Sequence, residues 1–327
     1  MSKFDSPRLV RVMPHRPCWL WRIFALALSV GLAGSSSADG SIAVVATTGQ
    51  IGDALREITR GADVDIQQLC GPGVDPHSFQ PAVSDLRSMR SADAIIYNGF
   101  HLEAKLDAIL HGRYASKSWS MASAFPDSAR LDWIEDGQPV VGAPYDPHIW
   151  NHLAGWRRCV LALASHLATV DPDSAETYRQ NGERYAERIA AADAAAARRF
   201  ARIPKERRVL VSAHDAFNYF AKVYDFETIA VLGIGNNAEA DIKTMREVAS
   251  EISRRQIPVI FLESITNPRV TRALSEACAS RGWSVRIADE PLYSDDLGAR
   301  PPVDTFLGAF DHNVNLIVTS LESSNRS

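Results

Sequence analysis

Short apolar runs alternate with amphipathic segments in the first part of the chain. The apolar runs are rich in β-branched residues and end in turn-forming residues, which is typical of buried strands. Strands are predicted over 41–47, 64–69 and 94–97. Helices are predicted over 51–61, 84–91 and 102–110, with Ser84 as the N-cap of the second. This order predicts a parallel sheet that is covered by helices.

The same alternation returns after Pro204. Strands are predicted over 208–212, 226–231, 259–263 and 284–287. Helices are predicted over 241–255, 270–280 and 305–321. The second part of the chain therefore predicts another α/β unit of the same kind.

A long stretch without strand character separates these two parts. From Pro172 to Phe200 it is rich in Ala, Glu and Arg, and Gly182 is its one glycine, so one helix of about 30 residues is predicted. The alternative is a pair of helices broken near Gly182. The predicted fold class is thus α/β, with two parallel-sheet lobes joined by one long rigid helix. We place the lobes at 39–165 and 205–327 and the linking helix within 166–204.

Residues 1–38 have the pattern of a signal peptide. Arginines between positions 8 and 22 precede an apolar run over 23–32, and small residues follow over 35–38. The apolar run is too short to span a bilayer, so we expect cleavage after Ala38 rather than a membrane anchor. A lipid anchor needs a cysteine directly after the small residues, and none is there. The expected protein is exported and periplasmic.

Composition narrows the possible partners. The chain is 46% hydrophobic and 23% charged, as in a globular protein with a sizeable core. Without residues 1–38 it carries 30 basic and 38 acidic side chains, a balance of about −8 that disfavours nucleic acid or an anionic membrane as partner. We expect a monomer.

The three cysteines after residue 38, Cys70, Cys159 and Cys278, are far apart in the sequence. This spacing argues against a thiolate zinc site and allows at most one disulfide. At least two of the three are expected to be buried.

Two copies of one tripeptide carry the candidate chemistry. Asp75-Pro-His77 and Asp146-Pro-His148 each present a histidine from a stiff turn, because proline fixes its own φ and restricts the residue before it. His214 directly follows a predicted strand, where ligands gather in parallel sheets. Two unrelated turns and a satisfied core histidine are the alternative interpretation. Two copies of the tripeptide favour a preformed metal site.

The residues around these histidines resemble a known family. The similar segments are Asp75-Pro-His-Ser-Phe-Gln-Pro81, Ser84-Asp85, Ala92-Asp93, Tyr97-Asn98-Gly99, Leu102-Glu103, Asp146-Pro-His-Ile-Trp150, His214-Asp-Ala-Phe-Asn-Tyr-Phe220, Phe261-Leu-Glu-Ser264 and Leu292-Tyr-Ser-Asp-Asp-Leu-Gly298. In this order they resemble the extracytoplasmic solute-binding proteins of zinc and manganese ABC transporters, which include treponemal and streptococcal metal-binding lipoproteins. The resemblance covers essentially the whole chain after residue 38.

The resemblance implies a site and a function. It places the metal ligands at His77, His148, His214 and Asp295, two from each lobe, with the site in the cleft between the lobes. The Leu-Tyr-x-Asp pattern selects Asp295 over the adjacent Asp296. Glu263 is expected near the site, in a supporting or lobe-contact role rather than as a ligand. The implied function is capture of one divalent metal ion and its delivery to an ABC transporter permease.

The identity of the metal stays open. Three imidazoles and one carboxylate suit Zn²⁺, and also Mn²⁺ or Fe²⁺ if the carboxylate is bidentate, whereas Ca²⁺ and Mg²⁺ prefer oxygen ligands. The stretch from His111 to Asp146 lacks the long His- and acid-rich loop of dedicated zinc-uptake members, which favours manganese. His152 lies four residues after His148, and we interpret it as a rim or capping residue rather than a ligand.

Other functional classes compete with this reading. An exported metallohydrolase would use the same metal site, and it would need an open coordination position and a general base, for which Glu263 is the obvious candidate. Four protein ligands close a tetrahedral site, which favours binding over catalysis, so no catalytic residue is expected. An adhesin or host-interaction protein is a third class, and the missing lipid anchor argues against it.

Overall fold

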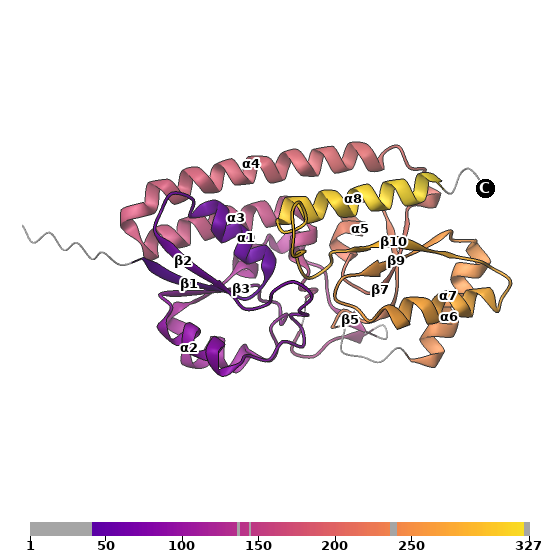
Figure 1. The fold of residues 1–327 in the computed structure, drawn as a ribbon, viewed down its shortest axis with the longest axis horizontal. Coiled ribbons are helices and arrows are strands. Elements are labelled where there is room, and N and C mark those ends of the chain that lie inside the picture. Colours follow the sequence, from indigo (N-terminus) through magenta and orange to yellow (C-terminus); the bar gives the residue numbers. More distant parts are fainter. Residues whose placement is uncertain (1–40, 136–137, 144, 236–240, 324–327) are drawn as a thin grey trace, which may run out of the picture. The chain divides into compact units, whose positions relative to one another are not determined.

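Two groups of parallel strands organise the fold (Figure 1). A computed structural model describes residues 41–135, 138–143, 145–235 and 241–323, which belong to one compact unit. The predicted signal peptide over 1–38 lies outside the described residues. No helix in the described part of the chain combines the length and the hydrophobicity that a bilayer span requires.

The first group of strands is a four-stranded parallel sheet in the order β2-β1-β3-β4. Its strands are β1 (Ile42–Ala46), β2 (Val64–Gln68), β3 (Ala94–Tyr97) and β4 (Ser118–Ser120). The helices α1 (Gly49–Ile58) and α2 (Val83–Ser91) connect the first three strands, as the alternation predicted. The central strand β1 lies between β2 and β3. Ala46, the last residue of β1, is opposite Gln68 at the end of β2 and opposite Ile96 near the end of β3. The carboxyl ends of these strands therefore meet at one edge.

The second group contains two parallel pairs, β7 with β8 and β9 with β10. Contacts between β7 and β9 place the two pairs side by side. The strands are β7 (Val209–His214), β8 (Glu227–Leu232), β9 (Val259–Glu263) and β10 (Arg286–Leu292). The helices among them are α5 (Asn218–Tyr224), α6 (Ile242–Arg255) and α7 (Pro268–Ala279). The two α/β lobes predicted from the alternation are confirmed, although α5 is an additional helix.

Long helices run alongside both groups of strands (Figure 1). They are α3 (Leu153–Val170), α4 (Ala175–Phe200) and α8 (Phe306–Ser323). Helix α4 packs on α1, α3 and α8, and one apolar core includes Val44 of β1 and Phe261 of β9. The α4 helix continues through Gly182, so the single helix predicted after Pro172 is confirmed and the pair broken near Gly182 is not seen.

Two local predictions were wrong. Instead of a regular helix over 102–110, the chain forms turns up to Leu106 and then a π-helix, Ile109–Arg113. Phe100 and His101 both have positive φ there, which interrupts a helical path before it begins. Ser84 lies inside α2, whose N-cap is Ala82; the carboxylate of Asp85 accepts the Ala82 N–H at 2.8 Å and so replaces a side-chain cap.

Short elements complete the chain. The two-stranded antiparallel hairpin consists of β5 (Ile134–Glu135) and β6 (Gln138–Pro139). Turns of 3₁₀-helix occupy Ala115–Lys117, Met121–Ala124, Asp127–Ala129, Ile149–Asn151, Pro172–Ser174 and Lys205–Arg207. Cys70, Cys159 and Cys278 are all buried free thiols, as expected for at least two of them.

Candidate metal centre

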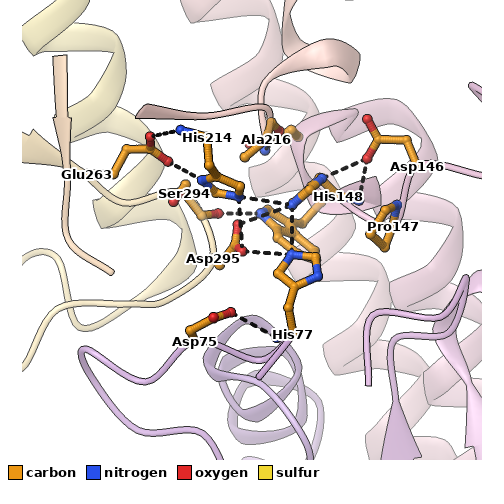
Figure 2. Close-up of polar contacts among 12 residues, drawn as sticks. Asp75, His77, Asp146, Pro147, His148, His214, Ala216, Glu263, Ser294 and Asp295 are labelled. Atoms are coloured by element: carbon orange, nitrogen blue, oxygen red, sulfur yellow. Dashed lines mark hydrogen bonds and ion pairs between the residues drawn. The ribbon is translucent and has the colours of Figure 1, made fainter. Parts of the chain in front are cut away.

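Four buried side chains from four distant segments converge between the two groups of strands (Figure 2). His77 lies on the loop after β2, and His148 directly precedes the 3₁₀ turn Ile149–Asn151. His214 is the last residue of β7, and Asp295 follows β10. Each of the four is at most 3% exposed. The structure thus brings together all four residues that the resemblance implied.

The four side chains point their polar atoms at one another. The Nε2 atom of His148 lies 3.2 Å from Nε2 of His77 and 3.4 Å from Nε2 of His214. The Asp295 oxygens lie 3.1 Å from Nε2 of His77, 3.5 Å from that of His148 and 3.4 Å from that of His214. These oxygens have no other hydrogen-bond partner among the described residues. Such an arrangement leaves buried lone pairs facing a common centre.

Both Asp-Pro-His tripeptides fold in the same way. In each, the aspartate carboxylate accepts the backbone N–H of the histidine two residues later, at 2.9 Å for Asp75 and His77 and at 2.9 Å for Asp146 and His148. This side-chain turn is a common habit of aspartate, and the intervening proline adds a fixed φ. The stiff presentation that the sequence predicted for His77 and His148 is confirmed.

Asp146 also orients the His148 ring. Its carboxylate accepts the Nδ1–H of His148 at 2.7 Å, which leaves Nε2 as the nitrogen that faces the centre. Burial opposes protonation of this ring, but Asp295 and Asp146 outweigh burial and raise the pKa of His148 to about 9. The sequence analysis used Asp146 only as part of a turn and missed this second contact.

Glu263 holds His214 in the same manner. One carboxylate oxygen accepts the Nδ1–H of His214 at 2.6 Å, and the other accepts the backbone N–H groups of Ala213 and His214, each at 2.8 Å. Burial opposes protonation of His214, but the charges of Glu263 and Asp295 raise its pKa well above the usual range. Glu263 therefore contacts one of the four converging residues, and its supporting role at a metal site stays a prediction.

The pKa values of His77 and of Asp295 are both lowered, but for different reasons. Burial lowers the pKa of His77, and the nearby Asp295 only partly opposes this shift. Burial by itself would raise the pKa of Asp295, but His214 and His148 hold it well below its usual range. The centre therefore contains an ionised carboxylate among imidazoles, with two further carboxylates behind them. This chemistry is suited to a cation.

A buried chain of hydrogen bonds supports the second tripeptide. The Glu103 carboxylate accepts from the Thr47 hydroxyl at 2.6 Å and from the Asn98 N–H at 2.7 Å. The Asn98 side-chain amide in turn donates to the Pro147 carbonyl at 2.8 Å. Asn98 and Glu103 belong to the segments that resemble the family, but no sequence pattern indicates this contact with Pro147.

Neighbouring candidates lie outside the centre. The Nδ1 atom of His152 accepts the Gly155 N–H at 2.9 Å and caps α3, which confirms its interpretation as a capping residue. Asp296 accepts the Gly73 N–H at 2.6 Å and is not among the four converging residues. Among the described residues, no second group of three or more His, Cys, Asp and Glu side chains is arranged to hold a metal ion.

Comparison with known proteins identifies the family. The family described as "Zinc-uptake complex component A periplasmic" matches residues 44–320. The chain belongs to this family. The match covers both lobes and all four converging residues, and related chains carry names such as metal ABC transporter substrate-binding lipoprotein. The family resemblance drawn from the sequence is thereby confirmed.

Individual relatives differ in the metal that their names give. The zinc-binding protein TroA of Treponema pallidum is 35% identical over 92% of this chain and 98% of its own. Its structure superposes with a TM-score of 0.81 over 86% of this chain and 99% of that one. The manganese-binding lipoprotein MntA of Bacillus subtilis is 32% identical over 93% and 97% of the two chains. The iron-binding protein YfeA of Yersinia pestis is 30% identical over 84% of each.

Proposed function

We propose that this protein captures one divalent transition-metal ion, zinc or manganese, and delivers it to the permease of an ABC transporter. The proposed ligands are His77, His148, His214 and Asp295. Membership of a family of transporter substrate-binding proteins supports the delivery role. We further propose that the protein works in the periplasm as a monomer after cleavage near Ala38.

The spacing of the converging atoms is the observation that carries this proposal. Four ligands at about 2.0–2.1 Å from a zinc ion in a regular tetrahedron lie roughly 3.3–3.4 Å from one another. Five of the distances among the ring nitrogens and the Asp295 oxygens run from 3.1 to 3.5 Å, and the four ligand atoms all lie within 4.8 Å of one another. A cation at the centre would therefore find its ligands already in place, while a second oxygen of Asp295 is within reach for a metal of higher coordination number such as Mn²⁺.

The geometry also disfavours the metallohydrolase alternative. A hydrolase keeps one coordination position open for water and places a general base beside it. Glu263, the candidate base, uses both carboxylate oxygens to hold Ala213 and His214. We therefore propose a binding protein without catalytic residues.

The test is metal content and competition on the purified mature protein. Elemental analysis is followed by titration of the metal-free protein with Zn²⁺ and with Mn²⁺. We expect one tightly bound ion per chain, and we expect tight binding to disappear in the His77→Ala and His148→Ala variants while the metal-free protein stays folded. The His152→Ala variant is the matched control and should still bind one ion. Failure of the wild-type protein to bind either ion would refute the proposal.

A further inference from the structure

A groove lies on the first lobe between α2 and the π-helix Ile109–Arg113. Its volume is about 270 Å³, and its apolar lining consists of Val83, Leu86, Ile109 and Tyr114. Val83 is 65% exposed and is one of four large apolar side chains that are exposed among the described residues. The groove therefore presents apolar surface to solvent.

The walls of this groove are fixed by the core beneath them. Tyr114 is buried, and its hydroxyl donates to the Leu86 carbonyl at 3.4 Å. Leu86, Ile109 and Tyr114 belong to one apolar cluster with residues of β1 and β3. Lys117 donates to two backbone carbonyls at the C-terminal end of α2. Because the walls are in place before a partner arrives, binding in the groove costs little conformational entropy.

Every charged side chain that lines the groove is an arginine. Arg87, Arg90 and Arg113 are exposed, and within the described part of the chain their guanidinium groups have no hydrogen-bond or ion-pair partner. Asp85 and Asp93, the acidic residues within α2 and just after it, each accept a backbone N–H. A chain that is acidic overall thus concentrates unpaired positive charge around this groove.

The size and the composition of the groove suit side chains of a protein partner. Its volume lies below the roughly 300–1,000 Å³ of most small-molecule pockets. Apolar surface bordered by charged side chains is the usual arrangement in protein–protein interfaces, where arginine is enriched. Arginine binds carboxylates through paired N–H groups. The matching segment therefore carries an apolar side chain between acidic residues.

The place of the groove in the fold indicates which partner is meant. The helices α3, α4 and α8 run along one side of both groups of strands, whereas α2 lies on the opposite side of the first sheet (Figure 1). A partner that receives an ion from the centre has to approach on a side that these long helices leave uncovered. Helix α2 also follows soon after His77 in the chain, so the groove and the centre belong to neighbouring parts of the first lobe.

We propose that this groove is a docking site for an acidic segment of the permease. An apolar side chain of that segment enters between α2 and the π-helix, while its carboxylates pair with Arg87, Arg90 and Arg113. The inference rests on the proposed function, since the partner is the permease to which the metal is delivered. The three arginines attract and hold the partner and take no part in metal binding.

The experiment measures binding of the metal-loaded protein to its permease in nanodiscs of zwitterionic lipid, at several salt concentrations. Glutamate replaces Arg87, Arg90 and Arg113 together in the groove variant. We expect its affinity to fall by about tenfold or more, mainly through slower association, with a weaker salt dependence than in wild type. Val83→Asp places a charge in the apolar part of the groove and should weaken binding mainly through faster dissociation.

A matched control reverses the same number of charges elsewhere. Arg158, Arg179 and Arg198 are exposed on α3 and α4 and likewise have no partner among the described residues. Glutamate at these three positions should leave permease affinity within about twofold of wild type, because charges outside an interface are largely screened at physiological salt. Both triple variants should bind one metal ion with wild-type affinity, since none of the six arginines is among the converging residues.

Glutamine at the three groove positions gives a second test that does not depend on the glutamate variant folding. Glutamine keeps a high helix propensity, and we expect a smaller loss of permease affinity in the same direction. Wild-type permease affinity in both groove variants, or an equal loss in the control variant, would overturn the docking site alone.

Other occupants of the groove would give different results. Binding to anionic lipid vesicles that is lost in the groove variant, with permease affinity unchanged, would assign the groove to a membrane surface and overturn the proposal. A wild-type dimer in sedimentation that separates in the groove variant, again with unchanged permease affinity, would assign it to a second copy of the chain. A wild-type protein that binds no metal or no permease would overturn the proposed function as well, so the two failures are distinguishable.

Discussion

Each of two proposed ligand histidines is hydrogen-bonded to a carboxylate that is itself outside the proposed ligand set. Glu263 and Asp146 accept the Nδ1–H groups of His214 and His148, and they thereby fix which nitrogen faces the centre. Glu263 also accepts hydrogen bonds from the backbone N–H groups of Ala213 and His214 at the end of β7. At the residue scale, the orientation of the imidazoles is therefore built by side chains that would not touch the metal.

Replacement of Glu263 by glutamine tests this arrangement. Glutamine has one acceptor oxygen in place of two, so it cannot hold both the backbone N–H groups and the His214 ring. We expect metal affinity to fall by about 10- to 100-fold in competition titrations. Glu276→Gln, an exposed change on α7, is the control and should leave the affinity unchanged. Equal affinity in the Glu263→Gln variant would show that His214 needs no such support.

The raised pKa of His148 predicts how stability of the metal-free protein depends on pH. Its pKa is about 9 in the folded protein and about 6.5 in the unfolded chain, so protonation favours the folded state. The stabilisation is complete below pH 6.5 and is lost as the pH rises through 9. Urea denaturation of metal-free protein should show a free energy of unfolding lower at pH 9.5 than at pH 6.5, by on the order of 3 kcal/mol from this group.

A variant assigns this pH dependence to His148. His148→Asn lacks the titrating ring, so its free energy of unfolding should change less over the same interval. The remaining pH dependence has the same sign, since His214 also has a raised pKa. A metal-free wild-type protein that becomes more stable from pH 6.5 to pH 9.5 would contradict the charge arrangement described for the site.

At the scale of elements, the close packing of α3 and α4 explains a glycine within a long helix. A Cβ at Gly182 of α4 would stand 2.7 Å from the Cβ of Ala164 in α3. Glycine in the middle of a helix costs about 1 kcal/mol relative to alanine, and here it permits the approach of the two helices. The alternative prediction from the sequence was a pair of helices broken near Gly182. That prediction interpreted Gly182 as a helix end, whereas it lies within α4 at the contact with α3.

The paired variants Gly182→Ala and Ala164→Gly test this interpretation. Gly182→Ala should lower the free energy of unfolding by about 1–3 kcal/mol despite its better helix propensity, because neither backbone can yield easily. Adding Ala164→Gly should restore part of the lost free energy of unfolding, because it removes the Ala164 methyl group that the new Cβ at position 182 contacts. Urea denaturation of the four proteins gives the coupling energy. A Gly182→Ala variant more stable than wild type would show that the helices have room to separate.

At the scale of the whole molecule, one ion would join segments that lie far apart in the chain. His77 and His148 come from the first lobe, and His214 and Asp295 come from the second. Because the unfolded chain does not present this arrangement, metal binding should stabilise the folded state as a whole. A metal ion bound by these four residues would thus link the two lobes energetically.

Thermal unfolding with and without metal measures that link. At a free metal concentration 1,000-fold above Kd, the stabilisation should reach about 4 kcal/mol, which raises the Tm by roughly 10 °C for a chain of this size. The shift should vanish in His148→Ala and persist in His152→Ala, although the latter loses a helix cap and unfolds at a lower temperature. A full shift in His148→Ala would place the stabilising ion elsewhere.

Local sequence patterns are sufficient to predict most of the strands and helices and the two stiffly presented histidines. Strands such as 94–97 and 259–263 and the helix after Pro172 follow from apolar pattern and composition, which act through neighbours in the chain. The two Asp-Pro-His turns are equally local, since each aspartate binds a backbone group two residues away. The prediction of a helix over 102–110 was wrong because the positive φ angles of Phe100 and His101 redirect the chain. The periodic pattern of apolar residues does not indicate such a backbone conformation.

The way these parts meet depends on contacts between residues that are far apart in the chain. The resemblance preferred Asp295 to Asp296 as a ligand. In the fold, Asp295 lies against three imidazoles, whereas Asp296 lies against Gly73 and Ser264. The pairing of Glu263 with His214 spans 49 residues, and that of Asn98 with Pro147 spans another 49. Such contacts depend on which strand ends share an edge and on how the lobes close on each other. No local pattern encodes that geometry, because it results from packing of the whole chain.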